Sequence, residues 1–160
     1  MTQRACIQAG EQAPVFSLHD QRDRVVFLAD FKGQRVLLSF HPLAWTSVCA
    51  TQMKTLDQQW QTFNKLHTVP LGISVDSVPS KKAWADHLKI THLQLLSDFW
   101  PHGEVAKAFG IFREKDGFSE RVNILINEEQ RIEYVQRYAI PELPDIQDIL
   151  TVLHTLEAEV

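Results

Sequence analysis

Short apolar runs recur along the chain, and their length and composition are those of β-strands. Three of them contain few polar residues, which is typical of strands buried on both faces of a sheet. These three runs are 35–40 (RVLLSF), 69–75 (VPLGISV) and 93–98 (LQLLSD). Two pairs of runs flank polar turns and therefore predict hairpins: 14–20 with 25–31, and 120–127 with 131–140.

Between these runs the apolar residues follow the period of a helix. In 47–66 they recur every three or four positions and so share one helical face, at Cys49, Met53, Leu56, Trp60 and Phe63. Three more helices are predicted. One spans 78–90 and opens with Pro79 and Ser80, and another spans 102–112 and ends near Gly110. The third is an amphipathic helix at 141–156.

Strands that alternate with helices, with hairpins near both ends, predict an α/β fold. We expect a central mixed β-sheet with helices on both faces and an N-terminal β-hairpin. The chain has 160 residues, with no internal repeat and no linker-like segment. It is therefore expected to form a single domain, 1–160, that buries a full core without a disulfide or a metal.

Composition narrows the function classes. Hydrophobic residues make up 44% of the chain, charged residues 22%, and the formal net charge is −4. This balance argues against nucleic acid or an anionic membrane surface as a partner. No stretch has the length of a membrane span or the apolar centre of a signal peptide. Two cysteines do not form a secreted disulfide framework, so we expect a reducing, cytoplasmic location.

One of the two cysteines, Cys49, follows the strand 35–40 at the start of the predicted helix 47–66. A helix N-terminus favours the reactive thiolate through its free N–H groups and positive dipole end. Thr46 has a hydroxyl that can cap the helix or donate to a sulfur or an oxygen substrate, and Pro42 can cover a pocket without offering an N–H. Cys49 also lies on the apolar stripe, so periodicity alone leaves open a buried, inert cysteine.

Residues 42–49, PLAWTSVC, match the pattern Pro-x-x-x-Thr-x-x-Cys. With this signature the chain resembles the peroxiredoxins, the AhpC/TSA family of thiol peroxidases with a thioredoxin-like fold. The resemblance continues through GEQAPVFSLHD, LLSFHPLAWTSVC and LLSDFWPHGEVAKAFGIF, and it is especially close to the alkyl hydroperoxide reductase E-like and bacterioferritin comigratory protein branches. It implies that hydrogen peroxide or an alkyl hydroperoxide is reduced by a peroxidatic cysteine that cycles via sulfenic acid.

The resemblance also implies roles for individual residues. Cys49 matches the peroxidatic cysteine, Thr46 the threonine that hydrogen-bonds the peroxide and the thiolate, and Pro42 the proline that shields the thiolate. Arg121 matches an arginine that stabilises the thiolate and the charge on the leaving oxygen. Without the resemblance, Arg121 would be interpreted as a solvated charge at a strand start. Gln52 stands where many relatives have an acidic residue, and we expect it to change a local hydrogen-bond network without a catalytic role.

The thiol that reduces the sulfenic acid is less well defined. The nearest position at which relatives carry a resolving cysteine is Lys54 here. Ser80, at another such position, is either a helix cap or the place of a lost or substituted resolving cysteine. Cys6 is either a free thiol or a resolving thiol, acting within the chain or across a dimer. We expect a one-cysteine enzyme that is reduced by thioredoxin, glutaredoxin or a low-molecular-weight thiol.

No metal, haem or flavin cofactor is expected, because the seven histidines lack zinc-site spacing and no other cofactor motif is present. The resemblance implies a homodimer, with Trp45 and the segment SDFWPHG near its interface. In the alternative interpretation of these aromatic residues, Trp84 and Phe99 belong to the core and Trp100 is partly exposed.

Two other functions remain open to the sequence. One is a non-catalytic peroxide sensor or redox-binding module that uses the same cysteine. The other is a thiol–disulfide oxidoreductase, although the absence of a Cys-x-x-Cys motif counts against it.

Overall fold

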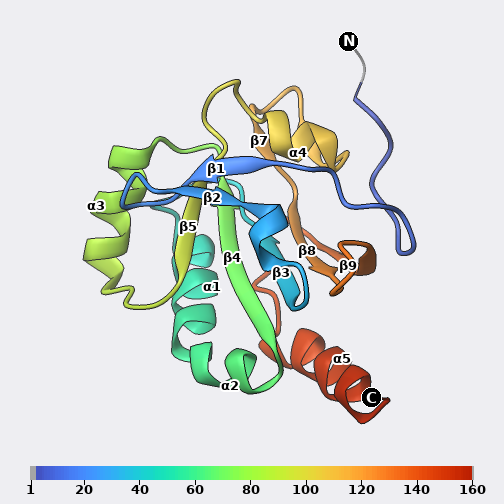
Figure 1. Cartoon of the computed structure of the whole chain (residues 1–160). Helices are drawn as coiled ribbons and strands as arrows, with labels where there is room; N and C mark the ends of the chain where they lie inside the picture. Colours follow the sequence, from blue (N-terminus) through green and yellow to red (C-terminus); the bar gives the residue numbers. More distant parts are fainter. Residues whose placement is uncertain (1–2, 160) are drawn as a thin grey trace.

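The computed structural model describes residues 3–159, and in this range seven strands form one mixed sheet (Figure 1). The strand order across the sheet is β2-β1-β5-β4-β3-β8-β9. The strands are β1 (Ser17–His19), β2 (Val25–Phe27), β3 (Arg35–Phe40), β4 (Thr68–Ser74), β5 (Gln94–Ser97), β8 (Arg121–Ile126) and β9 (Ile132–Tyr138). The short strands β6 (Phe112–Arg113) and β7 (Phe118–Ser119) pair with each other outside this sheet.

The centre of the sheet is parallel and its edges are antiparallel. β3 pairs in parallel with β4, and β4 with β5, whereas β8 runs antiparallel to both β3 and β9. β1 and β2 form the expected N-terminal hairpin. β3 and β8 are buried along their whole length, as the apolar run 35–40 predicts. The α/β class and the mixed central sheet are therefore confirmed.

Helices cover both faces of the sheet. They are α1 (Ser47–Gln58), α2 (Trp60–Lys65), α3 (Val78–Leu88), α4 (Glu104–Ala108) and α5 (Ile146–Ala158), with a 3-10 turn η1 (Leu28–Phe31). α1, α2, α3 and α5 share one hydrophobic cluster with Leu37, whereas α4 and η1 share another with the neighbouring Val36 and Leu38. Because side chains alternate across a strand, the two clusters lie on opposite faces of the sheet. Figure 1 shows α4 apart from α1, α2 and α5.

Helix lengths are modest throughout the described residues. The longest, α5, has 13 residues. None of the helices in 3–159 has the length and apolar character that a membrane crossing requires.

Some predicted boundaries were wrong. The predicted helix 47–66 is interrupted at Gln59, whose backbone leaves helical geometry between α1 and α2. The end of the predicted strand 25–31 is the 3-10 turn η1, because the antiparallel pairing with β1 stops at Phe27. The alternative that places Trp84 in the core is confirmed, because Trp84 is buried. The same alternative is wrong for Phe99, which is 50% exposed, and Trp100 is 81% exposed.

Candidate active site

Cys49 occupies the first turn of α1, three residues after the helix N-cap at Thr46. The loop that leaves β3 carries the chain to this position, so the thiol lies at the carboxyl end of a central parallel strand. Its side chain is fully buried among the apolar residues of the α1 face. The free N–H groups of a helix N-terminus favour a negative charge on a sulfur in this turn.

Arg121 brings a buried positive charge to the sulfur. β8 runs antiparallel to β3, with Val122 opposite Phe40, and this register places the start of β8 beside the active-site end of β3. The Nη1 of Arg121 donates to the Sγ of Cys49 at 3.3 Å. Nε and Nη2 both donate to the carbonyl oxygen of Ile140, at 3.0 and 2.7 Å. Arg121 is only 2% exposed, so it is not the solvated strand-start charge of the simpler interpretation.

Gln52 takes part in a local hydrogen-bond network, as expected, and the structure shows that this network includes Arg121. Its Oε1 accepts a hydrogen bond from Arg121 Nη1 at 2.6 Å. Its Nε2 donates to Ser39 Oγ at 2.7 Å, and Ser39 Oγ in turn donates to Asn123 Oδ1 at 2.8 Å. The sequence feature that points to this contact is the position of Gln52, one helical turn after Cys49 on α1. An amide there satisfies both the arginine and the hydroxyl, and it thereby fixes the orientation of the guanidinium.

A surface cavity of about 250 Å³ lies beside the buried sulfur. It is lined by Pro42, Leu43, Thr46, Ser47, Val48, Phe118, Arg121 and Ile140. Thr46 occupies the N-cap position, but its hydroxyl donates to the carbonyl oxygen of Leu43 at 2.9 Å and makes no cap hydrogen bond. The capping role predicted for Thr46 is therefore wrong. Its oxygen can still accept a hydrogen bond from a small ligand at the cavity.

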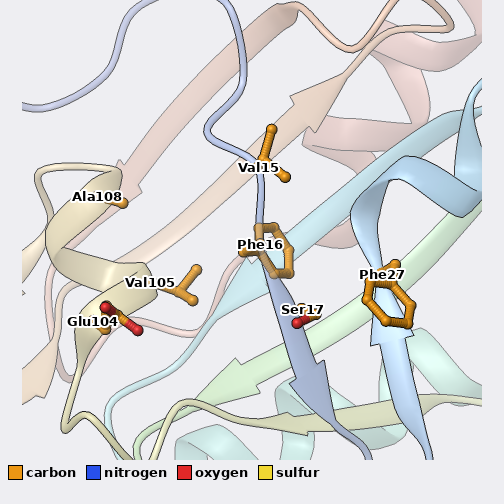
Figure 2. Close-up of a pocket in the computed structure, with 7 residues that line it drawn as sticks. All are labelled: Val15, Phe16, Ser17, Phe27, Glu104, Val105 and Ala108. Carbon is orange, nitrogen blue, oxygen red and sulfur yellow. The ribbon is translucent and has the colours of Figure 1, made fainter.

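A larger cavity of about 520 Å³ lies elsewhere, between the N-terminal hairpin and α4 (Figure 2). Its lining includes Val15, Phe16 and Phe27, with Val105 from α4. Glu104 is the one ionisable residue of the lining, and no thiol is present. This cavity has no group suited to peroxide chemistry. The smaller one is the candidate active site, because its lining includes Thr46 and Arg121, and Arg121 contacts Cys49.

Ser80, the possible former resolving position, is not a helix cap. The N-cap of α3 is Ser77, whose Oγ accepts from the backbone N–H of Ser80. The Oγ of Ser80 accepts a hydrogen bond from the indole Nε1 of Trp45 at 3.2 Å. Trp45 belongs to the loop before Cys49, so Ser80 is tied to the active-site loop. The cap interpretation of Ser80 is wrong.

Cys6 and Cys49 are both free thiols. Cys6 is partly buried and packs against the hydrophobic cluster on the α4 face, whereas Cys49 belongs to the cluster on the α1 face. The central sheet therefore separates the two sulfurs. In this arrangement they cannot form a disulfide with each other.

Histidines do not gather into a metal site. Within the described range 3–159, no group of three or more His, Cys, Asp or Glu side chains is placed to hold a metal ion. His41 is buried, whereas Nε2 of His102 donates to the carbonyl oxygen of Gly117, on the β6–β7 loop.

The sequence is similar to one protein family and to named relatives over most of its length. The model of the AhpC/TSA family matches residues 9–135. Alkyl hydroperoxide reductase E of Mycobacterium tuberculosis is 35% identical over 140 residues, which cover 87% of this chain and 91% of that protein. A putative peroxiredoxin, bcp, of Haemophilus influenzae is 40% identical over 129 residues, covering 76% and 81%.

Solved structures agree with the fold. The reduced form of a 2-Cys peroxiredoxin from Plasmodium vivax superposes with a TM-score of 0.85 at 26% identity, over 95% of this chain and 83% of that one. The thioredoxin-like fold expected from the sequence is therefore confirmed.

Proposed function

The chain belongs to the AhpC/TSA family and is a thiol peroxidase of the peroxiredoxin type, and we propose that Cys49 is the thiol that reduces hydrogen peroxide or an alkyl hydroperoxide. The observation that carries this assignment is the contact between Arg121 Nη1 and Cys49 Sγ, at 3.3 Å in a buried site. A fixed guanidinium beside a thiol at a helix N-terminus favours the thiolate, which is the nucleophile.

In the proposed reaction, the Cys49 thiolate attacks one peroxide oxygen, and the O–O bond breaks as the S–O bond forms. The cysteine becomes a sulfenic acid, and the other oxygen leaves with the electron pair and takes up a proton. Arg121 stabilises the negative charge as it moves from the sulfur to the leaving oxygen. Thr46 holds the peroxide through its hydroxyl, and Pro42 covers the cavity without competing for its hydrogen bonds.

Steady turnover is the direct test of this function. With a suitable reductant, the protein is expected to consume many equivalents of peroxide. Consumption that stops after one equivalent with thioredoxin, glutaredoxin and glutathione all supplied would favour the non-catalytic sensor. The comparisons do not favour that alternative, because the named relatives are a reductase and peroxiredoxins.

A second molecule must reduce the sulfenic acid in this proposal. Position 54 is a lysine, Ser80 has a hydroxyl, and the sheet separates Cys6 from Cys49. The reductant is then thioredoxin, glutaredoxin or a low-molecular-weight thiol in a reducing compartment, the cytoplasm. Leu43 and Trp45, on the active-site loop, are exposed apolar residues, as are Phe99 and Trp100 after β5, and this exposure supports a homodimer.

Cys6 is expected to take no part in turnover. After one equivalent of peroxide, non-reducing mass spectrometry of the intact protein should show oxidised Cys49 and no Cys6–Cys49 disulfide. A Cys6→Ser variant should turn over within about twofold of the unmodified protein, since Cys6 lies across the sheet from Cys49 and substitutions outside such a site usually have small effects. An intrachain disulfide together with slow turnover of Cys6→Ser would contradict this and would require movement of the N-terminal segment.

Gln52 is expected to act by orienting Arg121. Gln52→Leu removes the acceptor of the Nη1 hydrogen bond, and the rate of Cys49 oxidation should fall about tenfold, since a hydrogen bond to a charged group contributes roughly 1.5–3 kcal/mol. Gln52→Glu keeps an acceptor and should lose less. The rate is measured by stopped-flow tryptophan fluorescence in a single turnover. Gln58→Leu, an exposed change on the same helix, is the matched control, and an equal rate for both leucine variants would refute the role.

A further inference from the structure

The short hairpin β6–β7 lies outside the central sheet, yet it brings an aromatic side chain to the candidate active site. Phe118, on β7, is partly buried and packs against the hydrophobic cluster on the α4 face. It also lines the cavity of about 250 Å³, together with Arg121, which follows it by three positions in the chain. The reaction described above gives this phenylalanine no role.

The Phe118 ring is held in place by its partner across the hairpin. Arg113, on β6, pairs directly opposite Phe118, and its Cζ lies 5.8 Å from the centre of the ring, within the range of a cation–π contact. The guanidinium is itself fixed by two carboxylates. Its Nε donates to Oδ2 of Asp116 at 2.6 Å, and its Nη1 donates to Oε1 of Glu120 at 3.2 Å. The position of the ring at the cavity is therefore set before a ligand binds.

The cavity has a polar part and an apolar wall. Arg121, which contacts Cys49, is the only charged residue of its lining, and Thr46 and Ser47 supply hydroxyl groups. The wall consists of the apolar side chains of the lining, which are Pro42, Leu43, Val48, Phe118 and Ile140. A few convergent polar groups in a mostly apolar lining suit a ligand that is polar at one end and apolar at the other.

The cavity is also larger than hydrogen peroxide requires. Its volume is about 250 Å³, whereas one water molecule takes up about 30 Å³ of the liquid and hydrogen peroxide has only one more oxygen. With hydrogen peroxide at the polar part, the apolar wall would still be in contact with water. An apolar substituent on the peroxide would displace that water, and the burial of both apolar surfaces would favour binding.

We propose that Phe118 is a specificity-determining residue, and that the wall it forms with Ile140 receives the apolar group of an organic hydroperoxide. The preferred substrate is then a hydroperoxide with a compact alkyl or aryl-alkyl group rather than hydrogen peroxide. This inference rests on Cys49 being the reacting thiol. Its thiolate attacks the terminal oxygen and becomes the sulfenic acid. The oxygen that bears the apolar group leaves with the electron pair of the O–O bond, takes up a proton from water and departs as an alcohol.

The ratio of two oxidation rates tests the proposal. Single-turnover oxidation of Cys49, followed by tryptophan fluorescence, should be at least about tenfold faster with cumene hydroperoxide than with hydrogen peroxide, since even one methylene group in an apolar pocket has an effect of this size. In Phe118→Ala, the rate with cumene hydroperoxide should fall about tenfold, and the rate with hydrogen peroxide should stay within about twofold. An equal fall for both peroxides, or no preference for cumene hydroperoxide in the unmodified protein, would overturn the proposal.

Phe27→Ala is the matched control. Phe27 is also a partly exposed phenylalanine on a short hairpin, and it lines the larger apolar cavity near α4 (Figure 2). The ratio of the two rates in this variant should equal that of the unmodified protein. A ratio that falls as far as in Phe118→Ala would show that the preference does not arise at the wall, and it would overturn the proposal.

A competition experiment on the unmodified protein does not depend on the folding of a variant. The alcohol formed from cumene hydroperoxide, 2-phenyl-2-propanol, should slow the oxidation of Cys49 by hydrogen peroxide, and more hydrogen peroxide should restore the rate. Glycerol at the same concentration has no comparable apolar group and should leave the rate unchanged. An equal rate with the alcohol and with glycerol would overturn the proposal. If Cys49 reacted with neither peroxide, the proposed function itself would fail, so the two failures are distinguishable.

Discussion

Cys49→Ser is expected to lower the rate of peroxide reduction by at least about 10³-fold, as loss of a catalytic nucleophile typically does. Serine keeps the size and place of the side chain, but a hydroxyl does not ionise near neutral pH and is a weak nucleophile when unactivated. The buried site offers hydrogen bonds and a guanidinium but no base in contact with residue 49. Peroxide loss is followed in a coupled assay with thioredoxin and its reductase.

Cys6→Ser serves as the control for this variant, since it removes the other thiol from the far face of the sheet. The circular dichroism spectra of both variants should match that of the unmodified protein. If Cys49→Ser kept the full rate while Cys6→Ser lost it, the assignment of the nucleophile would be wrong.

Arg121→Met should reduce the rate of Cys49 oxidation by about 10²–10³-fold, the usual effect of removing one preorganised donor from developing negative charge. The variant also leaves Gln52 Oε1 and the carbonyl oxygen of Ile140 without their donor. Some loss of stability is therefore expected, and the thermal midpoint is measured alongside the rate.

Arg121→Lys separates charge from geometry. A lysine keeps the positive charge but cannot reach the sulfur, the amide and the carbonyl oxygen at once, so an intermediate rate is expected. Arg137→Met, at an exposed position on the neighbouring strand β9, is the matched control. A rate for Arg121→Met that equals that of Arg137→Met would exclude the arginine from the chemistry.

Much of the fold could be predicted from the pattern of apolar residues. The strand 35–40 was found because both of its faces are buried, and that leaves an unbroken apolar run. The break at Gln59 was missed because the apolar period continues across it, through Trp60 and Phe63. The exposure of Phe99 was missed because residue type alone does not show which aromatic side chains the core has room for.

The site was only partly predictable, because its polar contacts are not local in sequence. Cys49 could be found from its place between a strand and a helix, but the contact with Arg121 depends on the pairing of β3 with β8. The resemblance to a family supplied that arginine. Gln52 was expected to alter a local hydrogen-bond network, but its contacts with Arg121 and Ser39 could not be predicted, because only the packing shows that this amide is buried beside them.

The dependence of Cys49 on Arg121 also bears on the protein's synthesis. The two residues are 72 positions apart, and β8 is made after β3, β4 and β5. At about 5–20 residues per second on the ribosome, several seconds pass between the addition of the cysteine and that of the arginine. During this interval the growing chain carries a thiol without its guanidinium. We expect the nascent protein to be less sensitive to oxidants than the finished one, and to acquire its reactivity when the C-terminal half of the sheet has formed.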